Sequence, residues 1–421
     1  MEKAVKHFDN SSALISAQHK LKSKKRILFI AEAVTLAHVA RPYTLASALD
    51  AGNYDVRFAC DSHFDALFSD SKLAKVPIRS IPPSRFLDAL AKGEPVYDTP
   101  TLRQYVKEDL KIIERVNPDL IVGDFRLSLA VSVRLANIPY ANITNIYWSP
   151  YAVQTYPIPE HVMVRLVGLS LAQQLFDLVR PLIFASHTLP LNRVRKEFGL
   201  ASLGLDLRRT YTEADHILYA DMPGLIETTE LPSNHHYLGP ILWSPQASKP
   251  DWWERLDKSK PIIYLTLGSS GKTGRLSEIV NAISSLPVTL LVATAGRFQL
   301  ENPPPNVFCS DYLPGDEAAA LADLVICNGG SPTTNQALNA GVPVLGICTN
   351  LDQYLNMQAV QQSGAGRLLR AGMASRTTIL GAVNGMLTNP SCRKAAEKLG
   401  QAHREYNASA RFTALADKLL R

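Results

Sequence analysis

Short apolar runs alternate with longer amphipathic segments from Arg26 onwards, and this alternation predicts an α/β protein. Runs typical of buried strands occupy residues 26–31, 54–60, 74–81, 119–124 and 139–144. Segments with helical spacing of their apolar positions lie between them, at residues 40–52, 101–116 and 125–137. Strands and helices that alternate at this spacing form a parallel sheet covered on both faces.

A second series of the same kind follows residues 238–260, which are rich in proline, tryptophan and serine. Its expected strands are residues 261–271, 288–294, 306–314, 322–330 and 343–348, and its expected helices are residues 276–286, 333–340 and 354–364. Two such series predict two Rossmann-like lobes whose parallel sheets face an interdomain cleft, where ligands bind at the carboxyl ends of the strands.

The pattern divides the chain into five parts. We expect a flexible leader over 1–24, an N-terminal lobe over 25–240, a linker over 241–260, and a C-terminal lobe over 261–395. The charged amphipathic segment 396–421 is expected to be a C-terminal helix that packs back toward the N-terminal lobe.

Residues 161–185 depart from the alternation, because they are helical in pattern and unusually apolar, with Pro181 interrupting them. A buried helical pair beside the cleft is the favoured interpretation. The alternatives are an apolar channel for a ligand and a patch that faces a membrane.

Composition supports a folded protein. The 421 residues suit two domains, and hydrophobic and charged contents of 46% and 19% are those of a globular chain. The net charge of +6 is scattered apart from a basic run, Lys20 to Arg26, which we interpret as a solvated leader and not as a contact for lipid or nucleic acid. No nucleic-acid partner is expected.

Cysteine usage and hydropathy predict a cytoplasmic protein. The five cysteines lie far apart without the spacing of metal ligands, which favours reduced, buried thiols and no metal site. The first twenty residues lack the apolar core of a secretory signal, and no run of about 18 apolar residues occurs. Peripheral contact with the inner face of a membrane is the alternative to a freely soluble chain.

Small and hydroxyl residues follow two strands of the C-terminal half. Gly268, Ser269 and Ser270 form a turn between a strand and a helix, where backbone N–H groups can approach a phosphate. The turn at residues 328–334 combines two glycines with three hydroxyl residues at the start of a helix. These groups suit a diphosphate, and helix capping is the competing explanation. Asp352 and Gln353 follow the next strand and suit sugar hydroxyls, with N-capping as the alternative.

This stretch resembles the C-terminal motif of family 1 glycosyltransferases, the UDP-glycosyltransferase superfamily with the two-lobed GT-B fold. The family pattern is roughly HGGxGTxxEAL followed by GVPxLxxPxxxDQxxNAxxVxxxGxG. The chain has NGGSPTTNQAL followed by GVPVLGICTNLDQYLNMQAVQQSGAG. The likeness is to bacterial glycosyltransferases of the antibiotic, macrolide type. It implies that the N-terminal lobe binds an acceptor and that the C-terminal lobe binds a nucleotide sugar.

The resemblance also implies a set of donor contacts. Leu313 would meet the uracil or thymine base, and Asp352 and Gln353 would hold the sugar. The residues implied around the diphosphate are Gly268, Ser269, Ser270, Asn328, Gly329, Gly330, Ser331, Thr333 and Thr334. Asn328 stands where the family has a histidine, and Pro332 where it has a second glycine, so the diphosphate meets a neutral amide.

The sequence AHVARPYTLASAL at 37–49 is similar to the family element GHxxPxxxLAxxL, shifted by one residue. The resemblance makes His38 the general base and Asp124 the carboxylate that orients it. A capping or core histidine is the alternative for His38, and an N-cap is the alternative for Asp124. The implied mechanism is a direct, inverting displacement without a covalent intermediate, a metal or a cofactor.

The expected activity is transfer of a hexose from a UDP- or dTDP-sugar to a hydroxyl of an apolar small molecule or lipid. Aromatic residues across 140–190 favour an apolar acceptor or, alternatively, a packed core; they include Tyr147, Trp148, Tyr151, Tyr156 and Phe176. A non-catalytic nucleotide-sugar-binding protein is the second hypothesis, and a sugar-nucleotide epimerase is a less favoured third.

Overall fold

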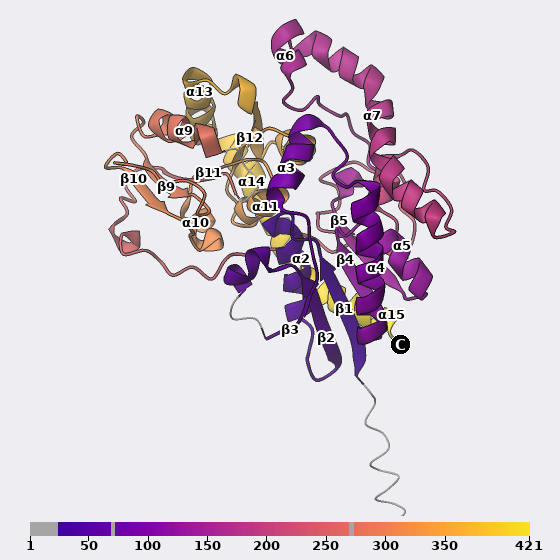
Figure 1. The fold of residues 1–421 in the computed structure, drawn as a ribbon. Coiled ribbons are helices and arrows are strands. Elements are labelled where there is room, and N and C mark those ends of the chain that lie inside the picture. Colours follow the sequence, from indigo (N-terminus) through magenta and orange to yellow (C-terminus); the bar gives the residue numbers. More distant parts are fainter. Residues whose placement is uncertain (1–23, 69–71, 269–272) are drawn as a thin grey trace, which may run out of the picture.

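The computed structural model describes residues 24–68, 72–268 and 273–421. Nearly all of the expected leader and two expected donor contacts, Ser269 and Ser270, lie outside the described residues. The described chain forms two α/β lobes, each built on one parallel sheet (Figure 1). The predicted fold class, two Rossmann-like lobes of the GT-B type, is confirmed.

The N-terminal lobe has a seven-stranded sheet in the order β3-β2-β1-β4-β5-β6-β7. Its strands are β1 (Lys25–Ala31), β2 (Tyr54–Cys60), β3 (Ala74–Pro77), β4 (Leu120–Asp124), β5 (Tyr140–Thr144), β6 (His216–Tyr219) and β7 (His235–Tyr237). Its helices are α2 (Leu36–Ser47), α3 (Pro83–Lys92), α4 (Thr99–Val116), α5 (Leu129–Ala136), α6 (Val162–Val167), α7 (Leu169–Glu197) and α8 (Leu207–Tyr211). The strand order reverses between β1 and β4, which is where sheets of this kind bind ligands.

The C-terminal lobe has a six-stranded sheet in the order β10-β9-β8-β11-β12-β13. Its strands are β8 (Ile262–Thr266), β9 (Thr289–Ala293), β10 (Val307–Ser310), β11 (Leu324–Cys327), β12 (Val344–Cys348) and β13 (Gly366–Arg370). The helices that follow the linker are α9 (Leu276–Ile283), α10 (Gly315–Leu321), α11 (Ser331–Asn339), α12 (Leu351–Gln362), α13 (Arg376–Leu387), α14 (Pro390–Glu405) and α15 (Ala408–Leu419). The order reverses between β8 and β11, so each lobe offers a ligand position.

Two helices, α14 and α15, stand where one helix over 396–421 was expected, and the second of them returns to the N-terminal lobe. Helix α14 packs on α11 in the C-terminal lobe. The chain then bends, and the side chain of Asn407 caps α15 by accepting from the backbone N–H of Ala410 at 2.9 Å. Helix α15 packs on α2, and the ring of its Phe412 lies 5.7 Å from that of Phe29 in β1. The apolar core of the N-terminal lobe therefore includes residues from the end of the chain.

The buried helical pair expected over 161–185 is wrong. Leu166, Leu178 and Leu182 are 72%, 75% and 73% exposed. Pro181 does not interrupt the segment either, because it lies inside α7, which runs without a break to Glu197. In Figure 1, α6 and the first part of α7 stand out from the body of the molecule. The apolar residues of this segment form a face of α6 and α7 that points outward and that no other described part of the lobe covers.

Polar contacts hold the two lobes together beside α12. The Glu160 carboxylate of the N-terminal lobe accepts from the Tyr354 hydroxyl at 2.6 Å and pairs with Arg370 at 3.2 Å. Arg370 also donates to the carbonyl oxygens of Ile158 and Pro159, at 2.9 and 3.1 Å. These contacts, which we call the Glu160 seam, fix one lobe against the other at the edge of the cleft.

Candidate active site between the lobes

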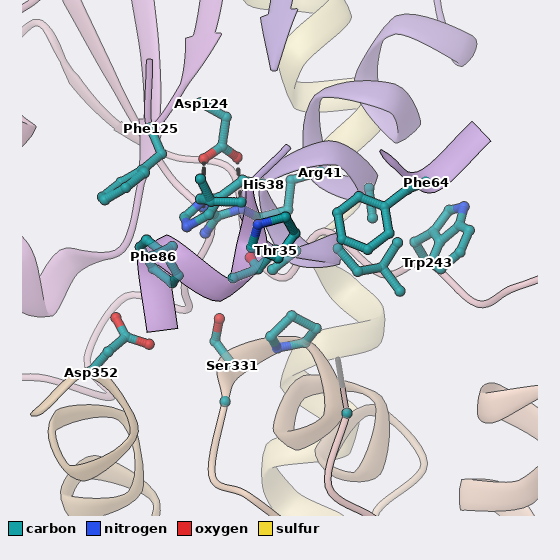
Figure 2. Close-up of a pocket in the computed structure, with 18 of the residues that line it drawn as sticks. Thr35, His38, Arg41, Phe64, Phe86, Asp124, Phe125, Trp243, Ser331 and Asp352 are labelled. Carbon is teal, nitrogen blue, oxygen red and sulfur yellow. Dashed lines mark hydrogen bonds and ion pairs between the residues drawn. The ribbon is translucent and has the colours of Figure 1, made fainter. Parts of the chain in front are cut away.

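A cavity of about 700 Å³ lies between the lobes and is lined by residues of both. The N-terminal lobe contributes the loop after β1, the start of α2 and the end of β4. The C-terminal lobe contributes the starts of α11 and α12. Figure 2 shows Ser331 and Asp352 on the side of the cavity opposite His38 and Asp124. The cavity thus lies at the carboxyl ends of both sheets, as the strand patterns predict.

His38 and Asp124 meet directly in this cavity. β1 and β4 are neighbours in the sheet with Ala31 opposite Asp124, so the loop after β1 begins beside this carboxylate. His38 lies in the first turn of α2, and its Nδ1 is 2.8 Å from Oδ1 of Asp124. When Nδ1 carries the proton and donates it to Asp124, Nε2 keeps its lone pair. The Asp124 side chain is fully buried, whereas that of His38 is 18% exposed at the cavity wall.

Arg41 is a member of the site that the sequence analysis missed. Its Nε and Nη2 donate to the two oxygens of Asp124 at 2.8 and 2.7 Å, and its Nη2 lies 3.0 Å from Nδ1 of His38. Burial lowers the pKa of Arg41, but the charge and hydrogen bonds of Asp124 outweigh it and leave the pKa raised. Asp124 therefore balances a buried cation in addition to orienting His38. The signal was the one-residue shift in 37–49, which places Arg41 before the proline.

Phe125 follows Asp124 in a strained backbone conformation. Its φ is +58°, in the left-handed region that bulky residues avoid. This conformation brings its ring onto the imidazole of His38, with ring centroids 4.6 Å apart and planes 13° apart. Strain of this kind costs on the order of 1–3 kcal/mol and persists where surrounding contacts impose it. The ring of Phe125 limits the orientations open to His38.

A second buried carboxylate supports the site from behind. Arg41 donates through Nη1 to Asn145 at 2.7 Å, and Asn145 donates through its amide to Asp221 at 2.9 Å. Asp221 also accepts from the backbone N–H of Ile146 at 2.7 Å. Burial raises the pKa of Asp221 to about 6, against the opposing effect of these hydrogen bonds.

Most of the expected donor contacts line the cavity. They are Gly268, Leu313, Asn328, Gly330, Ser331, Thr333, Asp352 and Gln353. Gly330 is the N-cap of α11, so the cavity meets the positive end of a nine-residue helix. Asn328 accepts from the backbone N–H of Gly330 at 3.1 Å, which holds its amide at this turn. The arrangement suits an anionic group such as a diphosphate.

Gly329 and Thr334, also expected to hold the diphosphate, are placed by the structure behind the cavity wall. Gly329 has φ +86°, and an added Cβ would lie 2.6 Å from Sγ of Cys348. Thr334 donates to the carbonyl oxygen of Gly330 and accepts from the Asn356 amide at 2.7 Å. Both residues build the turn that presents its neighbours. The Thr334 hydroxyl does not cap α11 either, because Gly330 is the N-cap and no side chain of the described residues accepts from the free N–H groups there.

The pair Asp352–Gln353 has divided roles. The Gln353 side-chain oxygen accepts from the backbone N–H of Thr349 at 2.8 Å and completes a capping box with Asn350, which is the N-cap of α12. Asp352 is therefore not the cap. Its Oδ1 accepts from Nε1 of Trp148 in the N-terminal lobe at 2.8 Å. A carboxylate held by the opposite lobe at the cavity is placed to bind hydroxyl groups.

The remaining wall of the cavity is apolar, but its residues differ from those expected. Of the five aromatic residues proposed in 140–190, Trp148 lines the cavity, whereas Tyr147, Tyr156 and Phe176 belong to a buried cluster. The packed-core alternative holds for those three. The apolar lining comes chiefly from the loop after β2, from α3, from the residue after β4 and from the linker, and it includes Phe64, Phe86, Leu87, Leu90, Phe125 and Trp243.

Comparisons with known proteins agree with this architecture. A family model described as "Erythromycin biosynthesis protein CIII-like, C-terminal domain" matches residues 277–416. A PGL/p-HBAD biosynthesis rhamnosyltransferase of Mycobacterium bovis (strain BCG / Pasteur 1173P2) is 50% identical over 379 residues, which cover 90% of this chain and 84% of that relative. A PGL/p-HBAD biosynthesis glycosyltransferase of Mycobacterium tuberculosis (strain ATCC 25177 / H37Ra) is 49% identical over 392 residues, covering 93% and 92%.

Solved structures share the fold at low sequence identity. The spinosyn rhamnosyltransferase SpnG is 19% identical and superposes with a TM-score of 0.68, covering 94% of this chain and 99% of that one. Relatives with about 50% sequence identity over most of both chains establish the family. The structural superposition establishes the fold. The chain belongs to the family 1 glycosyltransferases of the antibiotic type, which have the GT-B fold.

Proposed function

We propose that this glycosyltransferase moves a hexose from a UDP- or dTDP-sugar to a hydroxyl group of an apolar small molecule or lipid, with inversion at the anomeric carbon. The observation that carries the proposal is the 2.8 Å contact of His38 with Asp124 across the cavity from Ser331 and Asp352. A base on one lobe and an anion-binding helix terminus on the other are the two requirements of a direct displacement.

In the proposed reaction, Nε2 of His38 removes the proton from the acceptor hydroxyl. The acceptor oxygen then attacks the anomeric carbon from the face opposite the diphosphate. The new carbon–oxygen bond forms as the bond to the diphosphate breaks, and the nucleotide diphosphate leaves with the bonding electrons. Asp124 stabilises the imidazolium that results, in the way that a carboxylate supports a catalytic histidine in other enzymes. Phe125 stacks on His38 and Arg41 binds Asp124, and these contacts keep His38 and Asp124 in position relative to each other.

The donor is proposed to lie along α11. The N-terminal amides of α11, the hydroxyls of Ser331 and Thr333, and the Asn328 amide would bind the diphosphate. Leu313 would meet the base and Asp352 the sugar hydroxyls. A thymidine diphosphate complex of SpnG and the rhamnosyltransferase name of the mycobacterial relative favour a dTDP-linked 6-deoxyhexose among the candidate donors.

The acceptor is proposed to occupy the apolar side of the cavity, next to Phe86, Phe125 and Trp243. We propose further that the transfer needs no metal or other cofactor, because the helix terminus supplies the positive potential for the leaving diphosphate. Transfer rates measured before and after dialysis against EDTA should then be equal.

Turnover with a panel of dTDP- and UDP-sugars tests the proposal, with aromatic alcohols bearing alkyl chains as acceptors and release of the nucleotide diphosphate as the readout. His38→Ala should lower kcat about 10³-fold or more while the donor still binds, because the base is lost and the donor site is untouched. His63→Ala is the matched control, because His63 also lines the cavity but pairs with Asp61 away from Asp124.

The second hypothesis, a nucleotide-sugar-binding protein without activity, is favoured by the neutral Asn328 at the position of the family histidine. It predicts a rise in Tm with dTDP or UDP and no turnover with any donor, in the wild type and in His38→Ala alike. A Tm unchanged by every nucleotide and sugar nucleotide would contradict both hypotheses.

A further inference from the structure

Exposed apolar side chains gather on α6 and α7. Of the fourteen large hydrophobic residues recorded as exposed in the described chain, ten lie between Val162 and Leu189. Helix α6 contains no buried residue, and the first half of α7 buries Ala172 and Phe176 alone. Isolated apolar side chains are ordinary on a protein surface, but a concentration of this kind marks a site of interaction.

The exposed side chains of α7 follow one face of the helix. Leu171, Leu175, Leu178, Leu182 and Leu189 recur at spacings of four, three, four and seven residues, which keep them in one line along a helix of 3.6 residues per turn. Their exposed fractions are 48%, 39%, 75%, 73% and 39%. We call this line the leucine face. At a rise of about 1.5 Å per residue it extends over roughly 27 Å.

Positive charge continues the leucine face toward the end of α7. Arg193 and Lys196 follow Leu189 at spacings of four and three residues, so they lie on the same line, and both are exposed. Arg165 is exposed among the apolar residues of α6, and Asp177 is the acidic residue within 162–189. An apolar line that ends in cations is complementary to a surface with a hydrocarbon interior and anionic headgroups.

We propose that the leucine face docks the protein on an anionic lipid bilayer, with α7 lying in the plane of the interface. A helix in this position buries its leucines in the acyl boundary while its arginine and lysine reach the headgroups. No helix of the described residues is long and apolar enough to cross a membrane, so α7 would lie on the bilayer and not span it. A second copy of the chain is the less favoured occupant, because both copies carry the net charge of +6.

The docking helix is in contact with the wall of the cavity. Nε2 of His187 in α7 lies 3.0 Å from the carbonyl oxygen of Gly93, which ends α3. Helix α3 lines the apolar side of the cavity with Leu87 and Leu90. On the proposed function, a lipid acceptor held in the bilayer would therefore have its apolar binding wall beside the membrane contact. The docking itself needs no donor or acceptor and can be measured separately.

Flotation of the purified chain with vesicles tests the docking. The wild type should float with vesicles of phosphatidylglycerol and phosphatidylcholine, and more weakly with phosphatidylcholine alone. The double variant Leu178→Glu/Leu182→Glu should lower the partition coefficient at least about tenfold, because two apolar contacts become charged. Arg193→Gln and Lys196→Gln should each weaken binding to the anionic vesicles about fivefold and leave binding to neutral vesicles unchanged.

Leu135→Glu/Met373→Glu is the matched control, since it adds the same charge at two exposed apolar sites outside α6 and α7. It should float like the wild type, and all variants should keep the thermal unfolding profile of the wild type. Equal loss of binding in the control, or a wild type that does not float, would overturn the proposal. So would a wild-type dimer that Leu178→Glu/Leu182→Glu dissociates while vesicle binding stays the same. Neither result depends on whether the sugar is transferred.

Discussion

The Asp124 carboxylate has two cationic or basic partners, and its position depends on both. Arg41 occupies both of its oxygens, while His38 contacts Oδ1. Removing one partner of a buried ion pair leaves a charge without compensation, which costs about 3–5 kcal/mol. The contacts of Arg41 are therefore part of the geometry that keeps the proposed base in place, although Arg41 itself need not touch a substrate.

Arg41→Met should separate this positioning effect from simple loss of stability. Without Arg41, Asp124 loses a donor on each of its oxygens and its contact with Nδ1 of His38 is no longer fixed, so kcat should fall by up to about 10²-fold. KM for the donor should stay the same. Arg41→Lys keeps a charge but loses the two-pronged contact, and its kcat should fall less. An unchanged kcat in Arg41→Met, with lowered thermal stability, would reduce Arg41 to a structural residue.

Asp221 gives stability a pH dependence that can be isolated by mutation. Its pKa of about 6 in the folded chain exceeds the usual value near 3.8, so the folded state holds a proton that the unfolded state releases. The contribution of Asp221 to the free energy of unfolding therefore falls as pH rises from about 4 to 6, by at most about 3 kcal/mol.

Asp221→Asn should remove this contribution. Urea unfolding at pH 4, 5, 6 and 7 should show the variant gaining stability relative to the wild type as pH rises, with no further change above pH 7. Asp215→Asn provides a comparison at a partly exposed carboxylate of the same lobe. A constant difference between Asp221→Asn and the wild type across this range would contradict the raised pKa.

The turn between β11 and α11 depends on one glycine more than on its neighbour. Gly329→Ala combines a φ of +86° with contacts of 2.6 Å to Cys348 and 2.8 Å to Met357, so we expect a loss of about 2–4 kcal/mol in the free energy of unfolding. Gly330→Ala is the control. Its φ is −71°, and its added Cβ would lie 3.3 Å from Asn328, so its effect on stability should be below about 1 kcal/mol. Equal losses in urea unfolding would contradict this account of the turn.

The long strands of both lobes follow from the sequence, because each is a buried apolar run with turns at its ends. The strands missed are β6, β7 and β13, of four, three and five residues. Their apolar runs are only two to four residues long and stand beside histidine or arginine, so the sequence pattern does not mark them as strands. The prediction of a buried helical pair over 161–185 failed for a different reason. Hydropathy alone does not show whether an apolar helix face meets protein or solvent.

The candidate site was partly predictable from the strand pattern. Asp124 ends β4 and His38 lies shortly after the neighbouring strand β1, and a parallel sheet brings such positions together. Arg41 and Phe125 could not be assigned from local pattern. The role of Arg41 depends on burial beside a residue 83 positions away, and that of Phe125 on a strained φ that its side chain does not favour.

Helix α15 completes the apolar core of the N-terminal lobe. Phe412 and Ala416 are buried in the core of the N-terminal lobe, beyond a C-terminal lobe that ends with α14. Phe412→Ala should lower the free energy of unfolding by about 3–5 kcal/mol in urea. Hydrogen exchange should rise more in β1 than in β8. The control is Lys418→Ala at an exposed position of the same helix, which should change the free energy of unfolding by less than about 0.5 kcal/mol. If Lys418→Ala lost as much stability as Phe412→Ala, the core role of Phe412 would be contradicted.

The position of α15 has a consequence for the order in which a growing chain acquires its structure. Domains made first usually fold first during synthesis. Here the sheet that the ribosome makes first lacks Phe412 until the whole second lobe has been translated, because the buried apolar residues of the second lobe lie within 253–396. The lobe translated second can therefore close its core before the lobe translated first. A nascent chain of this protein exposes the unfinished N-terminal sheet to chaperones and proteases until α15 has left the ribosome.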